Sequence, residues 1–161
     1  MVDASPIWNE KLYMGSFPVT GSDIGSAGFD LLVLCAVEPL YMLGNPSEHE
    51  TADLFRCPTF HAPFDDGPVT EEVVREARRG EWRTVKALRR GDRVLVTCNA
   101  GRNRSGLVIA LAIFALFPTA TSSDVIRLIK ERRVAPCGNE ALTNEGFIDL
   151  IHSWRRLWRK K

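Results

Sequence analysis

The sequence predicts an α/β layered domain, because it combines two buried strands with several helices. The stretches "FDLLVLCAV" (29–37) and "DRVLVTC" (92–98) are continuous apolar runs, which are typical of strands buried on both faces. Helical patterns lie between and after them, and strands interleaved with helices indicate this class. Since 161 residues with 45% hydrophobic content suffice for one core, we expect a single domain over residues 1–161.

The first half of the chain is predicted to contain short strands, a buried strand and a long helix. Residues 7–18, "IWNEKLYMGSFP", have the composition of one or two short edge strands. A helix is predicted from Thr70 to Arg90, with acidic residues first and basic residues last, which suits the helix dipole. We expect Gly80 to break or weaken this helix in its middle, because glycine is a poor helix former.

Three further helices are predicted in the second half. Residues 107–117 are apolar on every side, which indicates a buried helix, since spanning a bilayer takes about 20 residues. Residues 122–133 have apolar positions at helical spacing, with Ser122 or Ser123 as the expected N-cap. Residues 144–158 repeat the amphipathic pattern.

The charge balance argues against broad binding to nucleic acid. The chain has 21 basic and 20 acidic residues, a net charge of +1, so any anion site must be local. The start "MVDASPIW" lacks a signal-peptide pattern and the cysteines are widely spaced, so we expect free thiols in a reducing cytoplasm. The histidines are not spaced as metal ligands, and no metal or other cofactor is expected.

The loop "TCNAGRNRSG" (97–106) lies between a buried strand and a buried helix. This arrangement aims backbone N–H groups and a helix N-terminus at one point, where they attract an anion. Such a site favours the thiolate of Cys98 as a nucleophile, and the guanidinium of Arg104 can grip two phosphate oxygens. Gly101 permits a sharp turn of the backbone around the anion. The alternative is a structural turn that contains a buried cysteine.

Three motifs resemble the cysteine-dependent protein phosphatases, in particular their compact dual-specificity (atypical) branch. "LYMGSFP" is similar to the opening strand of that family, "CNAGRNRSG" to its phosphate loop (P-loop), and "RRVAPCGNEALTNEGF" to the segment that packs near the loop. The resemblance implies the cysteine-phosphatase fold, a central mixed, mostly parallel sheet of about four or five strands flanked by helices. It also implies a metal-independent phosphoric monoester hydrolase with a phosphorylated protein as substrate, and we expect a monomer.

The resemblance also implies a role for each residue of the loop. Cys98 would attack phosphorus to form a phosphocysteine intermediate that water then hydrolyses. Arg104 would hold the phosphate together with the loop amides. Ser105 would donate a hydrogen bond to the departing thiolate, and it is also a candidate N-cap of the following helix. The phosphate-binding residues are then Asn99, Ala100, Gly101, Arg102, Asn103 and Arg104.

A general acid must protonate the leaving group, and "HAPFDDGPVT" (61–70) supplies the candidate. Taken alone, its Asp, Gly and Pro residues are common turn chemistry. The segment "PFDDGP" is similar to the acid loop of the phosphatases of regenerating liver, which favours Asp66 as the acid and Asp65 as a supporting or substitute residue. Gly67 and Pro68 would allow this loop to close over the substrate.

Two loop residues keep other functions open. Thr97 stands where the family usually has histidine, which leaves a low-turnover phosphate-binding module as one alternative. Arg102 is either a solvated side chain or a contact to a second phosphate, and a basic residue at this position also occurs in lipid and inositide phosphatases. "GRNRSG" resembles the loop of RNA triphosphatases as well. A phosphoinositide, lipid or RNA 5'-phosphate phosphatase is therefore the other alternative.

The remaining cysteines and the basic C-terminal end have less specific interpretations. Cys35 matches the backdoor cysteine of the regenerating-liver phosphatases and is a candidate redox partner of Cys98, or else a small buried apolar residue. Cys57 and Cys137 are expected to be structural. The end "SWRRLWRKK" favours a helix terminus that packs on the domain, with contact to a membrane surface as the alternative.

Overall fold

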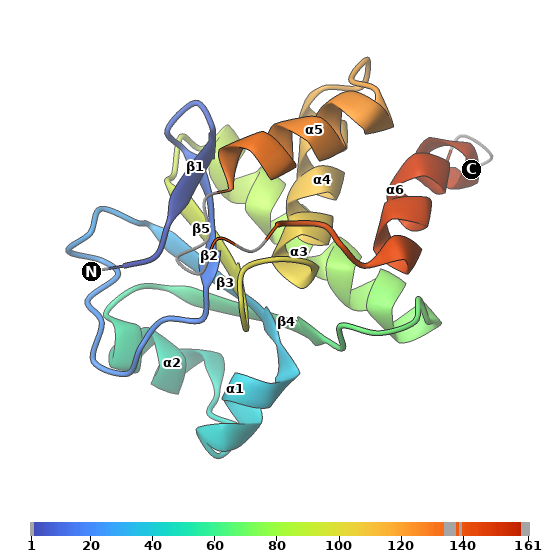
Figure 1. Ribbon diagram of the computed structural model, residues 1–161. Helices are drawn as coiled ribbons and strands as arrows, with labels where there is room; N and C mark the ends of the chain where they lie inside the picture. The colour runs from blue at the N-terminus through green and yellow to red at the C-terminus, as the bar shows by residue number, and fades with distance from the viewer. Residues whose placement is uncertain (1, 134–137, 139, 159–161) are drawn as a thin grey trace.

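The computed structural model describes residues 2–133, 138 and 140–158 of the chain. Its centre is a five-stranded sheet with the strand order β1-β2-β5-β3-β4 (Figure 1). The strands are β1 (Ser5–Trp8), β2 (Leu12–Ser16), β3 (Leu31–Ala36), β4 (Thr59–Phe64) and β5 (Val94–Cys98). Only β1 runs antiparallel to its neighbour, so the sheet is mixed and mostly parallel, as predicted.

The prediction of edge strands in residues 7–18 is correct for only one of the two strands found there. β1 lies at the edge of the sheet, but β2 lies between β1 and β5. Its five residues pair in parallel with the whole of β5, from Leu12 beside Val94 to Ser16 beside Cys98. This pairing brings the end of β2 next to the loop that follows β5.

Six helices cover the two faces of the sheet in the described part of the chain. They are α1 (Val37–Met42), α2 (Glu48–Phe55), α3 (Glu71–Arg89), α4 (Arg104–Leu116), α5 (Ser122–Arg132) and α6 (Glu145–Trp158). α1 and α2 lie on one side of the sheet and the four longer helices on the other (Figure 1). Alternate strand residues serve the two layers: Val33 and Val96 pack toward α3–α6, whereas Leu34 and Leu95 pack toward α1 and α2.

The helix α3 is continuous, so the predicted break at Gly80 is wrong. Gly80 is buried, and a Cβ built there would lie 3.2 Å from both γ-carbons of Val108 and 3.3 Å from the Cβ of Ala62. Glycine therefore lets α3 pack closely on α4 and β4. Packing stabilises the helix here despite the low intrinsic propensity of the residue.

The other predicted helices form, with small changes at their ends. α4 is buried along almost its entire length, as expected of residues 107–117. The N-cap of α5 is Thr121 rather than Ser122 or Ser123, because the Thr121 hydroxyl accepts the N–H of Asp124 at 3.1 Å. Across the described residues, no helix combines the length and apolar character needed to cross a membrane.

The packing of the C-terminal helix favours the interpretation of the basic end as a helix terminus that packs on the domain. Trp154 is buried in the core, and Arg155 donates a hydrogen bond to the carbonyl of Phe117 at 3.1 Å. The side chain of Trp158 and residues 159–161 lie outside the described residues, as does Cys137.

Replacing Gly80 by alanine tests whether close packing outweighs helix propensity. Alanine gains about 1 kcal/mol of intrinsic helix stability, but overpacking typically costs about 1–3 kcal/mol. Because Val108 and Ala62 belong to a buried helix and a strand, neither can move away easily. We expect Gly80→Ala to lower the free energy of unfolding by about 1 kcal/mol in urea titrations. An increase in stability would contradict this account of the α3–α4 contact.

Candidate active site

The loop between β5 and α4 turns its carbonyl groups outward. The carbonyl oxygens of Asn99, Gly101 and Arg102 accept hydrogen bonds from the Phe17 N–H (3.2 Å), from Arg133 Nε (2.9 Å) and from the Leu142 N–H (3.0 Å), respectively. In a planar trans peptide, the N–H points away from the carbonyl oxygen. The amides that follow these carbonyls therefore point into the loop, where an anion would bind.

Gly101 is required by a close approach of two backbone segments. It has a φ of +62°, and a Cβ there would lie only 2.5 Å from the carbonyl carbon of Gly15 at the end of β2. Both the left-handed conformation and this contact exclude a larger residue. The sequence predicted the turn at Gly101 but did not identify its neighbour.

Cys98 is the last residue of β5 and is buried beneath the loop. Its sulfur lies 3.2 Å from the Oγ of Ser105, which is also fully buried. Asn103 occupies the N-cap position of α4, so the prediction that Ser105 also serves as the N-cap is wrong. The hydroxyl of Ser105 faces the thiol instead.

Arg104 is buried at the start of α4 with one edge of its guanidinium held by the protein. Its Nη1 donates to Glu38 Oε2 at 2.5 Å and to the carbonyl of Phe64 at 3.2 Å. Its Nε has no partner among the described residues although it is buried. An oxygen of a bound phosphate can supply the missing acceptor, because a guanidinium binds oxyanions along one edge.

The charges around Arg104 keep it protonated. Burial by itself lowers the pKa of this guanidinium, but its hydrogen bond to Glu38 and the nearby Cys98, Glu38 and Asp66 raise the pKa overall. The hydrogen bond from Arg104 in turn lowers the pKa of Glu38. The sequence analysis missed Glu38. Its position two residues after the buried strand β3, at the same sheet edge as Cys98, was the available signal.

A second buried guanidinium, that of Arg133, supports the loop from its outer side. In addition to its bond to Gly101, it contacts Asp3 through Nη1 (2.8 Å) and Nη2 (2.6 Å). Asp3 Oδ2 also accepts the N–H of Ser16 at 2.9 Å. Burial raises the pKa of Asp3, but the hydrogen bonds from Arg133 and Ser16 outweigh this effect and lower it below its ordinary value. Sequence reasoning identified neither residue.

The predicted acid loop lies beside the phosphate loop. Asp66 Oδ2 accepts a hydrogen bond from Asn103 Nδ2 at 3.0 Å, and Asp66 Oδ1 accepts one from Asn144 Nδ2 at 2.9 Å. Both Asp65 and Asp66 are exposed, but the contacts to Asn103 and Asn144 are made by Asp66. The structure therefore brings Asp66 together with the loop, although the two segments are far apart in the sequence.

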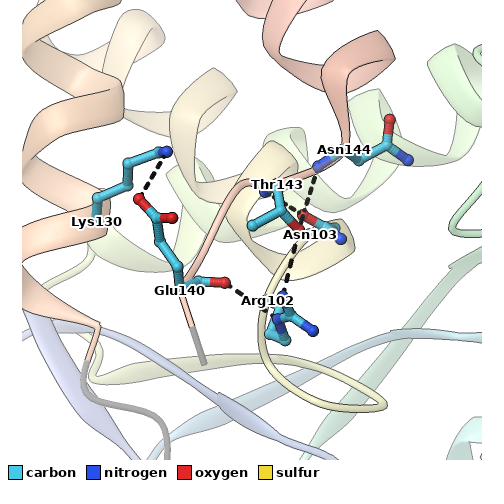
Figure 2. A network of polar contacts seen from close by, with 6 residues as sticks. All are labelled: Arg102, Asn103, Lys130, Glu140, Thr143 and Asn144. Carbon is cyan, nitrogen blue, oxygen red and sulfur yellow. Dashed lines mark hydrogen bonds and ion pairs between the residues drawn. The ribbon is translucent and has the colours of Figure 1, made fainter. Parts of the chain in front are cut away.

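Arg102 is half-buried and directed toward the segment that precedes α6 (Figure 2). Its Nε donates to the carbonyl of Glu140 at 3.0 Å and its Nη2 to Thr143 Oγ1 at 3.4 Å. The carboxylate of Glu140 forms an ion pair with Lys130 at 2.9 Å. Arg102 is thus not a fully solvated side chain, and the donors that could have met a second phosphate contact Glu140 and Thr143 here.

Thr97 and Cys98 point to opposite faces of β5. Thr97 is fully buried, and its hydroxyl donates to the carbonyl of Val33 in the adjacent strand at 3.3 Å. Neighbouring residues of a strand alternate between faces. Thr97 therefore bridges β5 to β3.

Cys35 and Cys98 are the residues that follow the last β3–β5 pair, Leu34 with Thr97. Val33 pairs with Val96 and Leu34 with Thr97, so the next position on each strand is a cysteine, and both cysteines belong to the same core layer. Burial, and then the proximity of Cys98, raises the pKa of the Cys35 thiol well above its ordinary value. Cys57 is also buried, with a pKa raised to about 11, which agrees with a packing role.

The described residues contain no group of three or more His, Cys, Asp or Glu side chains arranged to hold a metal ion. The components that lie at this loop are the Cys98 thiol, the Arg104 guanidinium with its unpartnered Nε, the inward amides after Asn99, Gly101 and Arg102, and the carboxyl group of Asp66. They suit a phosphate group without requiring a metal.

Comparison with known proteins identifies the fold. No protein-family model matches the sequence, and no curated protein matches it either. Among solved structures, the chain is similar to kinase associated phosphatase, crystallised with its catalytic-site cysteine changed to serine (TM-score 0.77, 16% identity, covering 100% of this chain and 97% of the other). It is also similar to PTPMT1 in complex with PI(5)P (TM-score 0.72, 12% identity, covering 96% of this chain and 95% of the other). A further similar structure is Tk-PTP in its active form (TM-score 0.71, 20% identity, covering 96% of this chain and 97% of the other). The protein has the fold of the cysteine-dependent phosphatases over the whole chain.

The Asp3–Arg133 pair predicts a pH-dependent contribution to stability. Because the folded-state pKa of Asp3 is lowered, its stabilisation is complete above the ordinary value of 3.8 and is lost as the pH falls through the lower folded-state value. Asp3→Asn should cost about 2 kcal/mol at pH 7, since it leaves Arg133 buried with a weaker partner. Urea titrations at pH 7 and pH 3 measure this difference, which should shrink at pH 3. An equal difference at both pH values would contradict the ion pair.

Proposed function

We propose that the protein is a metal-independent, cysteine-based phosphatase that hydrolyses phosphotyrosine, and also phosphoserine and phosphothreonine, in phosphorylated proteins. The observation that carries the proposal is the free, buried Nε of Arg104 in the same loop as the Cys98 thiol. We assign residues 1–161 to one catalytic domain that acts as a cytoplasmic monomer.

In the proposed reaction, the Cys98 thiolate attacks phosphorus while the bond from phosphorus to the leaving oxygen breaks. Arg104 and the inward amides of the loop stabilise the charge on the phosphoryl oxygens. The carboxyl of Asp66 transfers its proton to the leaving oxygen. Asp66 then accepts a proton from water, which attacks the phosphocysteine, and Ser105 donates a hydrogen bond to the departing thiolate at the distance seen here, 3.2 Å.

The alternatives have less support. PTPMT1 was crystallised with a phosphoinositide, but here Arg102, the main argument for a second phosphate, donates to Glu140 and Thr143. The case for a binding module without turnover depended on Thr97, whose side chain points away from Cys98. An RNA substrate finds little support in a net charge of +1. Phosphopeptides should therefore be hydrolysed faster than PI(5)P or RNA 5'-triphosphate ends.

Loss of the nucleophile is the direct test of this function. We expect wild-type protein to hydrolyse p-nitrophenyl phosphate in the presence of EDTA, and Cys98→Ser to reduce kcat by about 10³-fold or more. Serine is close in size, so the thermal midpoint of the variant shows whether the fold is retained. If both proteins are inert while a phosphotyrosine peptide still binds, the protein is a binding module and the proposal is wrong.

The register of β3 and β5 supports a second proposal, a reversible disulfide between Cys35 and Cys98. Adjacent strands lie about 4.8 Å apart, within the range that a disulfide requires. Hydrogen peroxide would oxidise the Cys98 thiolate to a sulfenic acid, and the Cys35 thiol would then displace water from that sulfur.

Peptide mapping after mild peroxide treatment tests this disulfide. We expect a Cys35–Cys98 crosslink and full recovery of activity with dithiothreitol. Cys35→Ser should lose activity irreversibly under the same treatment, because Cys98 then proceeds to sulfinic acid. Absence of the crosslink in the wild-type protein would refute the redox role of Cys35.

A further inference from the structure

Asn144 joins the acid loop to the start of α6. Its Oδ1 accepts the N–H of Phe147 at 3.2 Å, which is the contact of an N-cap residue. Its Nδ2 donates to Asp66 Oδ1 at 2.9 Å and to the carbonyl of Gly67 at 3.1 Å. One amide side chain therefore caps a helix and fixes the acid loop at two points.

Asn103 binds Oδ2, the second carboxyl oxygen of Asp66. Its Oδ1 accepts the N–H of Thr143 at 2.7 Å and the N–H of Asn144 at 3.0 Å (Figure 2). Its Nδ2 donates to Asp66 Oδ2 at 3.0 Å. Because Asn103 directly precedes Arg104, this contact links the acid to the phosphate loop itself.

The backbone partners determine the orientation of both amides. Each Oδ1 faces backbone N–H groups, which can only donate, so each Nδ2 must face the carboxyl group. Rotating either amide by half a turn would place an oxygen against an oxygen of Asp66 and leave the backbone donors unpaired. The arrangement therefore presents two amide donors to Asp66.

We propose that Asn103 and Asn144 form a two-amide clamp that positions Asp66 for proton transfer. The inference depends on the proposed phosphatase function and adds two positioning residues to it. Asp66 is exposed on a loop, where free movement would lower the fraction of time in which its carboxyl meets the leaving oxygen. The clamp confines that carboxyl next to the phosphate loop and leaves it exposed.

The clamp remains compatible with a protonated acid. Each amide uses one lone pair of its carboxyl oxygen, so another lone pair can carry the proton. When the O–H bond breaks and the proton passes to the leaving oxygen, the amides face a full carboxylate, to which hydrogen bonds are stronger. The clamp thus holds the same carboxyl group in place as the acid of the first step and as the base of the second.

Asn144→Ser is the variant that separates the clamp from the helix cap. Serine is a good N-cap, so it keeps an acceptor for Phe147, but it lacks the amide that reaches Asp66. Loss of acid positioning matters most when the leaving group is basic. We expect kcat/KM to fall about 10-fold more for phenyl phosphate than for p-nitrophenyl phosphate. Asn103→Asp keeps an acceptor for the N–H groups of Thr143 and Asn144. It should also lower kcat/KM more for phenyl phosphate than for p-nitrophenyl phosphate.

A double-mutant cycle gives the second readout. In an Asp66→Asn background no proton can be donated, so adding Asn144→Ser should leave both rates unchanged. Thr121→Ala, which removes the N-cap of α5, is the matched control for lost stability. It should lower the thermal midpoint without altering the ratio of the kcat/KM values for the two substrates.

Two results would overturn the clamp. One is an equal fall in kcat/KM for both substrates in the variants Asn144→Ser and Asn103→Asp. The other is a full effect of Asn144→Ser in the Asp66→Asn background, which would make the residue purely structural. If wild-type protein hydrolyses neither substrate, the proposed function itself fails, and the catalytic role of the clamp fails with it.

Discussion

The shape of the site depends on the hydrogen bonds of one buried group, the guanidinium of Arg133. It binds the carbonyl of Gly101 and the carboxylate of Asp3, and Asp3 in turn binds the end of β2 at Ser16. An unpaired buried charge is costly, so these groups remain together in the folded protein. Their contacts turn one loop carbonyl outward and direct the following amide inward. An anion site built from backbone amides needs this kind of external support.

The second guanidinium, that of Arg104, is fixed by the protein through one nitrogen and keeps another nitrogen available for a bound anion. Glu38 and the Phe64 carbonyl bind one nitrogen of its fork, which fixes the plane of the group. The buried Nε retains an unused donor. Because binding rigid groups costs little further entropy, this preorganised edge suits a phosphate whose charge is spread over several oxygens. Among the described residues of the site, this Nε is the buried side-chain donor without a partner, and we propose that a phosphate oxygen is its acceptor.

The acid loop gains its position from segments that are remote in sequence. Asn103 comes from the phosphate loop and Asn144 from the start of α6, and the two are linked through backbone N–H groups of the 143–144 segment. Movement of α6 or of the phosphate loop would therefore change the position of Asp66. In the proposed mechanism, this network connects the proton donor to the phosphate-binding loop, and it also contains Arg102 and Thr143.

The sequence by itself determined the α/β class, the strand–loop–helix unit around Cys98 and the candidate acid, because apolar periodicity and short motifs are local properties. It placed β2 at an edge and a break at Gly80, since pairing partners and close helix packing depend on distant residues. Only the tertiary structure brought Asp3, Glu38, Arg133 and Asn144 to the site. The sequence carries a partial signal for Glu38, which follows β3, and for Arg133 and Asn144, which lie in the segment "RRVAPCGNEALTNEGF". Their partners could not be inferred from the sequence, because a hydrogen bond forms only where the fold places two groups within reach of each other.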